Sequence, residues 1–241
     1  MKKRYKRLTY TFPNAIEIYE HLDGRYGARG SPRKKKKKLT PEQVRKRNQW
    51  NRERKARHKL RTWFQENDYL VTLTYKKSER PEDMKQAVKE LGKALRKIRN
   101  EYRKRGYDFR YLRNIEVGTR GAWHIHLVAN RIPDADIIIK KAWDHGGVNF
   151  KLLYEKGEFA DLAAYITKTP DTDPRLKESA YHASQNLPVP EPERKVLTRW
   201  KKQPKPKPGY YIDKGSFHEG INPATGYKYR YYTMIRIKRR C

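Results

Sequence analysis

The chain has 241 residues, which is enough for one large domain or for one domain with extensions. Lys and Arg number 59 against 27 Asp and Glu, so the net charge is +32, and 29 aromatic residues are interleaved with these charges. Self-repulsion of this size destabilises a folded chain unless a polyanion binds to it, so nucleic acid is the leading candidate partner and an anionic membrane the weaker one.

Cysteine content and hydropathy narrow the class of protein further. Cys241 is the single cysteine, which excludes intrachain disulfides and multi-cysteine zinc sites and favours a reducing compartment. No apolar run approaches the roughly 20 residues of a membrane-spanning helix. We therefore expect a protein of the host cell's cytoplasm that has no membrane partner.

Residues 1–66 are predicted to form a basic N-terminal extension. Segments 8–12 and 15–19 are candidate short strands around Pro13-Asn14, and Thr40-Pro41-Glu42-Gln43 is a capping-box start for a helix that extends to about Glu66. The linker between the second candidate strand and the helix contains consecutive positive charges, which repel one another unless phosphate groups neutralise them. We predict DNA-binding roles for these five lysines, Lys34, Lys35, Lys36, Lys37 and Lys38.

Residues 67–170 are predicted to form one α+β domain. The alternation and periodicity of apolar residues predict, in order, a strand at 69–75, a helix at 81–105, strands at 111–117 and 122–128, a helix at 135–144 and a strand at 148–154. This βαββαβ order is typical of a ferredoxin-like or RRM-like antiparallel sheet that has helices on one face and leaves the other open for a ligand. A short helix is expected over 157–168.

Residues 171–241 are predicted to form a basic C-terminal extension. A proline-rich spacer covers 203–208, where Pro and Lys alternate. Segments 210–213 and 227–237 are candidates for a hairpin around the turn at 222–226.

The strand at 122–128 carries two histidines, His124 and His126, on one face. A three-residue loop, 119–121, with Gly121 in its left-handed position, sets Glu116 of the preceding strand directly across from His124. Two imidazoles and a carboxylate with open positions left over suit a catalytic metal better than a closed structural site. The alternative is a half-buried strand whose histidines merely face solvent.

Three motifs follow one another in this domain: Val71-Thr72-Leu73-Thr74 on a strand, His124-Ile125-His126 on a strand and Tyr165-Ile166-Thr167-Lys168 on a helix. In order and spacing they resemble the HUH endonuclease superfamily over about 69–170, and most closely its single-tyrosine rolling-circle replication initiators, the Rep proteins. The resemblance implies metal-dependent, site-specific nicking and joining of single-stranded DNA through a 5′-phosphotyrosine intermediate.

The resemblance also implies roles for individual residues. Tyr165 would be the catalytic nucleophile, and Lys168 would hold phosphate charge or ease formation of the phenolate. Glu116, His124 and His126 would bind Mg²⁺ or Mn²⁺, although zinc also binds imidazoles. Arg120, in the hairpin loop, is a further candidate for DNA binding.

The expected partner is single-stranded DNA at a hairpin origin of a plasmid or phage. No P-loop motif occurs, so a separate helicase and a polymerase, from the host or elsewhere, would be needed. Within the same chemistry, a single-tyrosine transposase or a relaxase is the alternative, and a non-catalytic nucleic-acid-binding module is the alternative of a different class. Four other tyrosines are fallback nucleophiles: Tyr154, Tyr181, Tyr210 and Tyr211.

Overall fold

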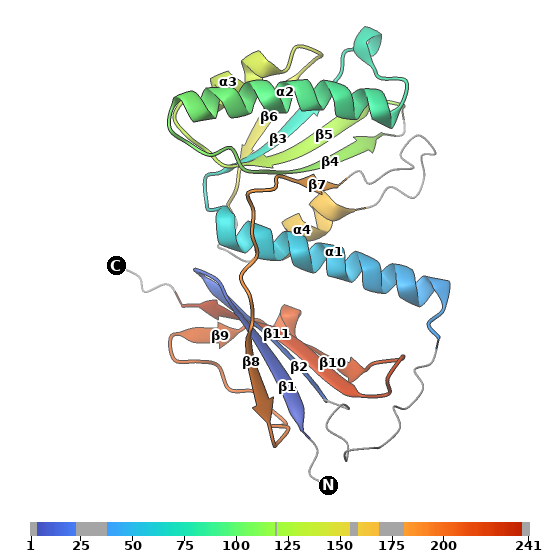
Figure 1. Ribbon diagram of the computed structural model, residues 1–241, viewed down its shortest axis with the longest axis vertical. Coiled ribbons are helices and arrows are strands. Elements are labelled where there is room, and N and C mark those ends of the chain that lie inside the picture. Colours follow the sequence, from blue (N-terminus) through green and yellow to red (C-terminus); the bar gives the residue numbers. More distant parts are fainter. Residues whose placement is uncertain (1–3, 23–37, 119, 155–158, 169–180, 238–241) are drawn as a thin grey trace. The chain divides into compact units, whose positions relative to one another are not determined.

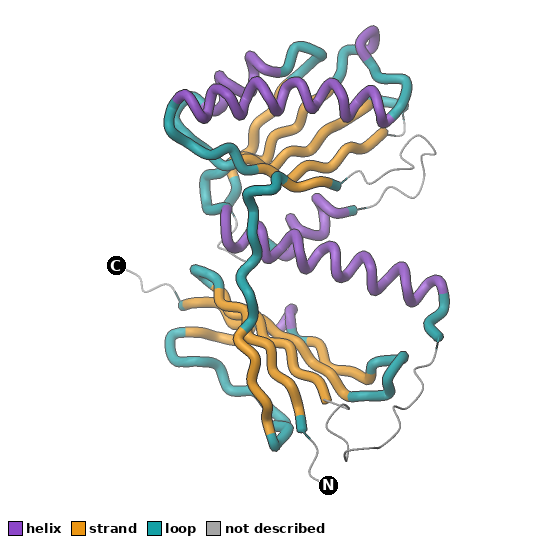
Figure 2. The backbone as a smooth tube through the Cα atoms, in the orientation of Figure 1, coloured by secondary structure: helices purple, strands orange, loops and turns teal. Residues whose placement is uncertain are grey.

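The computed structural model describes residues 4–22, 38–118, 120–154, 159–168 and 181–237. The chain divides into two compact units. The central unit consists of residues 51–188, and the terminal unit combines residues 1–50 with residues 189–241. Helices and antiparallel strands make the chain an α+β protein, as predicted, and Figure 2 shows its strands gathered into two sheets.

The central unit is built on a five-stranded antiparallel sheet in the order β6-β3-β5-β4-β7. Its strands are β3 (Tyr69–Thr74), β4 (Tyr111–Val117), β5 (Trp123–Ala129), β6 (Val148–Leu152) and β7 (His182–Ala183). Helices α2 (Met84–Lys104) and α3 (Ala135–Ala142) lie on one face of this sheet (Figure 1). The predicted βαββαβ order is therefore confirmed, and β7 is an additional short edge strand.

Helix α2 forms because apolar residues recur every three or four positions and bury one stripe against the sheet. Leu91, Leu95, Ile98 and Tyr102 belong to the same buried cluster as the inward-facing residues of β3 and β5. Each buried aliphatic side chain of this kind stabilises the fold by roughly 1.5–3 kcal/mol. Gly106, with a φ of +78°, follows the end of the helix, as expected for a C-terminal stop.

Helix α2 begins later than the sequence predicted, because Asp83 caps it. The Asp83 carboxylate accepts a hydrogen bond of 2.8 Å from the backbone N–H of Gln86, which satisfies one of the free donors of the first turn. A short 3₁₀ helix, Lys77–Glu79, precedes this cap.

The opposite face of the central sheet is only partly open. Helix α4 (Ala160–Thr167) and the second half of α1 (Pro41–Trp63) cover one end of it. Leu60 of α1 and Leu162 of α4 belong to one buried cluster with Leu112 of β4 and Val128 of β5. The expected open face is therefore restricted to the end of the sheet that carries His124 and His126.

The start of α1 agrees with the capping box predicted from the sequence. The Thr40 hydroxyl accepts a hydrogen bond of 3.2 Å from the backbone N–H of Gln43, and the Gln43 side chain accepts one of 3.1 Å from the N–H of Thr40. Within the described ranges, none of the helices has a stretch long and apolar enough to span a bilayer.

The terminal unit is a six-stranded antiparallel sheet that joins the two ends of the chain. Five strands run in the order β10-β11-β2-β1-β8, and β9 also pairs with β11. They are β1 (Tyr5–Thr11), β2 (Ala15–Leu22), β8 (Glu193–Leu197), β9 (Tyr210–Ile212), β10 (His218–Ile221) and β11 (Lys228–Arg236). The ends of the chain were expected to form separate extensions, whereas their strands pair with each other.

Two predicted features of this sheet are confirmed, and one differs. The strands β1 and β2 overlap the predicted segments 8–12 and 15–19, and β9 pairs with the end of β11. The turn at 222–226, however, joins β11 to β10 rather than to β9. A further 3₁₀ helix, Lys214–Ser216, fills part of the connection.

A buried charge network holds β1, β2 and β11 together. The Glu20 carboxylate accepts hydrogen bonds from the guanidinium groups of Arg7, at 2.6 Å, and Arg230, at 2.5 Å. The side chains of Glu20 and Arg230 are each 1% exposed, and the Arg230 guanidinium also lies 4.4 Å from the Trp200 ring centre. A small apolar cluster around Ile18 and Tyr232 lies beside this network.

Candidate functional site

The β4–β5 hairpin brings a carboxylate and two imidazoles to one face of the central sheet. Glu116 pairs with His124 across the two strands, and Asn114 pairs with His126. The N–H of Gly118 donates to the carbonyl of Ala122 at 2.8 Å, which closes the loop that was predicted from its length. Gly121 has a φ of +67°, the left-handed conformation that such a loop needs. The predicted register is therefore confirmed.

Strand β3 lies on the other side of β5 and adds two hydroxyl groups to the same face. Thr72 pairs with His126, and Thr74 pairs with His124. The Thr72 hydroxyl lies 3.4 Å from Nδ1 of His126. His126 is thus flanked by polar side chains on both neighbouring strands.

Helix α4 delivers Tyr165 to the edge of the His126 ring. The Tyr165 hydroxyl oxygen lies 3.0 Å from both Nδ1 and Nε2 of His126, and the two rings meet edge to face with centres 5.0 Å apart. The helix is anchored by Leu162 and Ile166, which are buried one turn apart. Tyr165 itself stays 40% exposed, so part of the residue is in contact with solvent.

The Glu116 carboxylate also contacts the His126 ring. Its Oε2 lies 3.5 Å from Nε2 of His126. This hydrogen-bonding contact lowers the pKa of Glu116 from its ordinary value of 4.5, and the nearby charge of Lys168 acts in the same direction, while partial burial opposes them. Glu116 is therefore an anion at neutral pH.

Burial shifts two other groups at the site. It lowers the pKa of His124 below its ordinary value, with help from the positive charges of His126 and Arg80, so His124 is a neutral imidazole at pH 7. Burial also raises the pKa of the Tyr165 phenol, and the negative charge of Glu116 adds to the rise. A nearby positive charge would be needed to favour the phenolate.

Asn114 connects α4, the helix that carries Tyr165 (the tyrosine helix), to β4, the strand that carries Glu116. Its side-chain amide nitrogen donates to Oε1 of Glu116 at 3.3 Å and to the backbone carbonyl of Lys168 at 3.1 Å. The side chain is fully buried, and its oxygen has no hydrogen-bond partner among the described residues. Sequence analysis missed Asn114, although its position two residues before Glu116 places both on one strand face.

The three predicted metal ligands share a face without closing around a common point. The rings of His124 and His126 are nearly parallel, with centres 6.4 Å apart, and Glu116 contacts His126. Among the described residues, no group of three His, Cys, Asp or Glu side chains is arranged so that it could hold a metal ion. The donor types nevertheless fit a divalent ion, because neutral imidazole and carboxylate are both ligands for Mn²⁺ and zinc.

Some of the remaining predicted site residues lie near this face, and others do not. Lys168 follows α4 as its C-cap, and its backbone N–H donates to the Tyr165 carbonyl at 3.3 Å. Its exposed side chain carries the charge that helps to lower the pKa of Glu116. Arg120 is exposed in the β4–β5 loop. Lys38 is exposed before α1, whereas Lys34, Lys35, Lys36 and Lys37 lie outside the described residues.

Arg80 is a second residue that sequence analysis missed. Its guanidinium donates to the backbone carbonyl of Arg120 at 3.5 Å, and its charge is close enough to lower the pKa of His124. Its Nε is buried and has no hydrogen-bond partner among the described residues. No local pattern pointed to Arg80, because it reaches the hairpin from the segment after β3.

The four fallback nucleophiles differ in burial and in the unit that contains them. Burial raises the pKa of Tyr181 to about 12, which disfavours the phenolate. Tyr154 follows β6 and is 71% exposed. Tyr210 and Tyr211 belong to the terminal unit.

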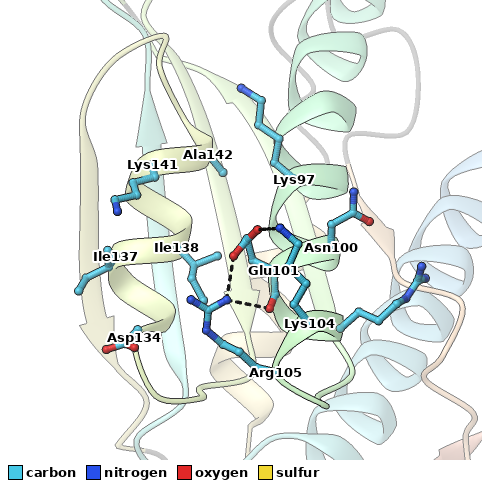
Figure 3. Close-up of a pocket in the computed structure, with 11 residues that line it drawn as sticks. Lys97, Asn100, Glu101, Lys104, Arg105, Asp134, Ile137, Ile138, Lys141 and Ala142 are labelled. Atoms are coloured by element: carbon cyan, nitrogen blue, oxygen red, sulfur yellow. Dashed lines mark hydrogen bonds and ion pairs between the residues drawn. The ribbon is translucent and has the colours of Figure 1, made fainter.

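A groove of about 920 Å³ lies elsewhere on the central unit, between α2 and α3 (Figure 3). Its walls carry several basic side chains, including Lys97 and Lys141. Glu101 in its middle accepts hydrogen bonds of 2.8 Å from both Lys104 and Arg105. None of the predicted catalytic or metal-binding residues lines this groove.

Comparison with known family models gives a match that lies within the central unit. Residues 68–170 match a family model whose description begins "Replication-associated protein ORF2". The match spans β3 to α4 and therefore includes Glu116, His124, His126 and Tyr165. No curated protein and no solved structure gave a significant match.

Proposed function

We propose that this protein initiates rolling-circle replication by nicking and rejoining single-stranded DNA at a specific site. The observation that carries the proposal is the position of the Tyr165 hydroxyl, 3.0 Å from both ring nitrogens of His126. A phenol is thereby held against a His-x-His strand, within the segment that matches a replication-associated family. The broader assignment to DNA replication rests on that match alone.

The proposed reaction is a transesterification with Tyr165 as the nucleophile. The Tyr165 oxygen forms a bond to the scissile phosphorus while the bond from phosphorus to the 3′ oxygen breaks. The products are a 5′-phosphotyrosine and a free 3′-hydroxyl, which carries the proton that the phenol has lost. Because the phosphoester is conserved, attack by a 3′-hydroxyl on the phosphotyrosine reverses the step and seals a strand.

Glu116, His124 and His126 are the residues that would hold Mg²⁺ or Mn²⁺ in this proposal. The ion would supply positive charge to the oxygens of the scissile phosphate. The protein's own cations act in the same direction: Lys168 lies at the end of the tyrosine helix and Arg80 beside the β4–β5 loop. Their charges favour the bound phosphate.

The charge distribution supports a polyanionic partner, which in this proposal is single-stranded DNA at a hairpin origin. The terminal unit contains 30 Lys and Arg against 8 Asp and Glu, a net charge of +22, while the central unit contains 29 against 19, a net charge of +10. Phosphate contacts supply most of the sequence-independent affinity for DNA. We assign origin binding mainly to the terminal unit, with strand separation and synthesis left to a separate helicase and polymerase.

One feature of the central sheet argues against a purely binding role. An RRM-like module stacks bases on an open sheet face. Here α4 and α1 cover one end of that face, and the end that remains open carries His124, His126 and Glu116. A transposase or relaxase would use the same residues. These functions are therefore distinguished by which DNA the protein cleaves.

The test is formation of a covalent adduct. The full chain is incubated with single-stranded oligonucleotides that carry candidate hairpin origins, together with Mn²⁺, and is analysed on a denaturing gel. We expect an adduct that Tyr165→Phe abolishes and that the control Tyr154→Phe, at an exposed tyrosine, retains. An adduct that persists in Tyr165→Phe contradicts the assignment of the nucleophile, and no adduct with any DNA contradicts the proposed function.

A further inference from the structure

A second groove, of about 510 Å³, lies at the edge of the central sheet, between the C-terminal part of α2 and the segment that contains β7. Its volume is within the range of sites that bind small molecules or parts of larger ones. The groove is lined by basic, aromatic and neutral polar side chains, and nothing in the proposed reaction uses them.

This groove is separate from the candidate nuclease site. Tyr111, which lines it, and Glu116 both belong to β4 but lie five positions apart, or about 17 Å along a strand that rises ~3.3 Å per residue. Side chains an odd number of positions apart point to opposite faces of a sheet. A ligand in this groove would therefore lie on the α2 face, away from Tyr165.

The cations of the groove are Arg99 and Arg103, which lie one helical turn apart on α2 and are both exposed. Asp108 contributes a carboxylate to the lining, but that group is paired with the Arg110 guanidinium at 2.9 Å. The groove thus presents two guanidinium groups to a ligand, an arrangement that suits phosphate.

Aromatic rings form the other wall. Phe109 and Tyr111 are near-parallel at 28° with centres 5.4 Å apart, and Tyr111 and His182 are likewise at 28° with centres 6.2 Å apart. This run of rings ends at His182, which is exposed, and Tyr107 at the end of the groove is 47% exposed. Burial and the charges of Arg113 and Lys59 lower the pKa of His182, so its ring is neutral at pH 7.

We propose that this groove binds a segment of single-stranded DNA outside the cleavage site. Arg99 and Arg103 hold consecutive phosphates, and a base stacks on the exposed ring of His182 or Tyr107. Basic groups that follow the backbone, combined with aromatic platforms for the bases, are how proteins bind single strands with little sequence preference. The inference extends the proposed function by giving the same polymer a second contact on the opposite face of the sheet.

The first test locates the DNA directly. A short oligothymidylate that contains 5-iodouracil is bound to the full chain and irradiated, and the crosslinked peptides are identified by mass spectrometry. We expect crosslinks at Tyr107 or His182. Crosslinks that occur only at other positions would overturn the proposal.

The second test measures affinity by fluorescence anisotropy with the same oligonucleotide without iodine. The double variant Arg99→Ala/Arg103→Ala is compared with Lys85→Ala/Lys89→Ala, which removes two exposed charges with the same spacing from the other end of α2. We expect about a tenfold loss for the arginine pair and a salt-dependence slope smaller by about 1.4, since each phosphate contact on a single strand contributes ~0.7. An equal loss of affinity in both double variants would contradict specific binding of DNA in this groove.

Failure of this inference can be told apart from failure of the proposed function. The crosslinks do not require cleavage, so Tyr165→Phe is expected to retain them while it loses the covalent adduct. An adduct without crosslinks at Tyr107 or His182 refutes the groove alone. Crosslinks without an adduct refute the nuclease alone.

Discussion

The side-chain amide of Asn114 donates a hydrogen bond of 3.1 Å to the backbone carbonyl of Lys168, the C-cap of the helix that carries Tyr165. The same amide group donates to Glu116 at 3.3 Å. A single buried side chain therefore connects the position of Tyr165 to the orientation of the carboxylate that faces His126.

Asn114→Ala is expected to slow formation of the covalent adduct by about 10–100-fold, a loss typical when a group that orients metal ligands is removed. The measurement is the initial rate of adduct formation at a temperature where the variant stays folded. Asn130→Ala is the control, because Asn130 makes comparable hydrogen bonds, at 2.7 and 3.0 Å, at the other end of β5. Equal rates in the two variants would contradict a positioning role for Asn114.

Glu116 is expected to titrate below its ordinary pKa of 4.5 in the metal-free protein. Because the folded state favours its ionised form, Glu116 stabilises the fold above about pH 4.5, and this contribution is lost as the pH falls through the lowered pKa. Carboxyl-carbon NMR measures the value directly. In His126→Ala, the pKa should rise, since contact with His126 is the largest cause of the shift; an unchanged value would contradict the observed pairing.

Metal removal tests the ligand set. Excess EDTA should abolish the adduct, and added Mn²⁺ should restore it. Calorimetric titration with Mn²⁺ should show that Glu116→Gln and His124→Ala each weaken binding at least about tenfold, or ~1.4 kcal/mol. His145→Ala is the control, because His145 lies beyond α3 beside Glu79 rather than on the face of β5. Adduct formation that is unaffected by EDTA would exclude a metal role.

The terminal sheet should depend strongly on its buried ion pair. Glu20→Ala leaves the Arg230 guanidinium buried without its carboxylate partner, which we expect to lower the free energy of unfolding by about 3–5 kcal/mol. Denaturant unfolding followed by circular dichroism measures the change. Glu193→Ala, which breaks the exposed pair of Glu193 with Lys195, should leave stability within experimental error. Similar losses of unfolding free energy in both variants would show that burial does not determine how much an ion pair contributes to stability.

The register of the β4–β5 hairpin was predictable because its cause is local. A three-residue loop with Gly121 in a left-handed conformation leaves only one pairing of the adjacent strands, so Glu116 opposite His124 followed from loop length. Helix α2 was predictable for a similar reason, since the apolar stripe that buries it and the glycine that ends it lie in one short stretch of sequence. Metal binding and catalysis stay predictions, because they depend on side-chain chemistry that the fold alone does not test.

The approach of Tyr165 to His126 was not derivable from pattern alone. It results from packing between α4 and the sheet, where Leu162 belongs to the same cluster as Leu112 and Val128. The terminal sheet was missed for a related reason. Glu20 and Arg230 are 210 positions apart in sequence, and no local periodicity records a pairing across that separation.

The pairing of β2 with β11 also determines when the terminal sheet can form during synthesis. The ribosome completes residues 51–188 before β11 emerges, so the central unit can fold while β2 still lacks its neighbour. Contacts this distant in sequence form slowly. A chain released before β11 would carry the candidate nuclease residues without a complete terminal sheet, and one edge of β2 would be left open to aggregation.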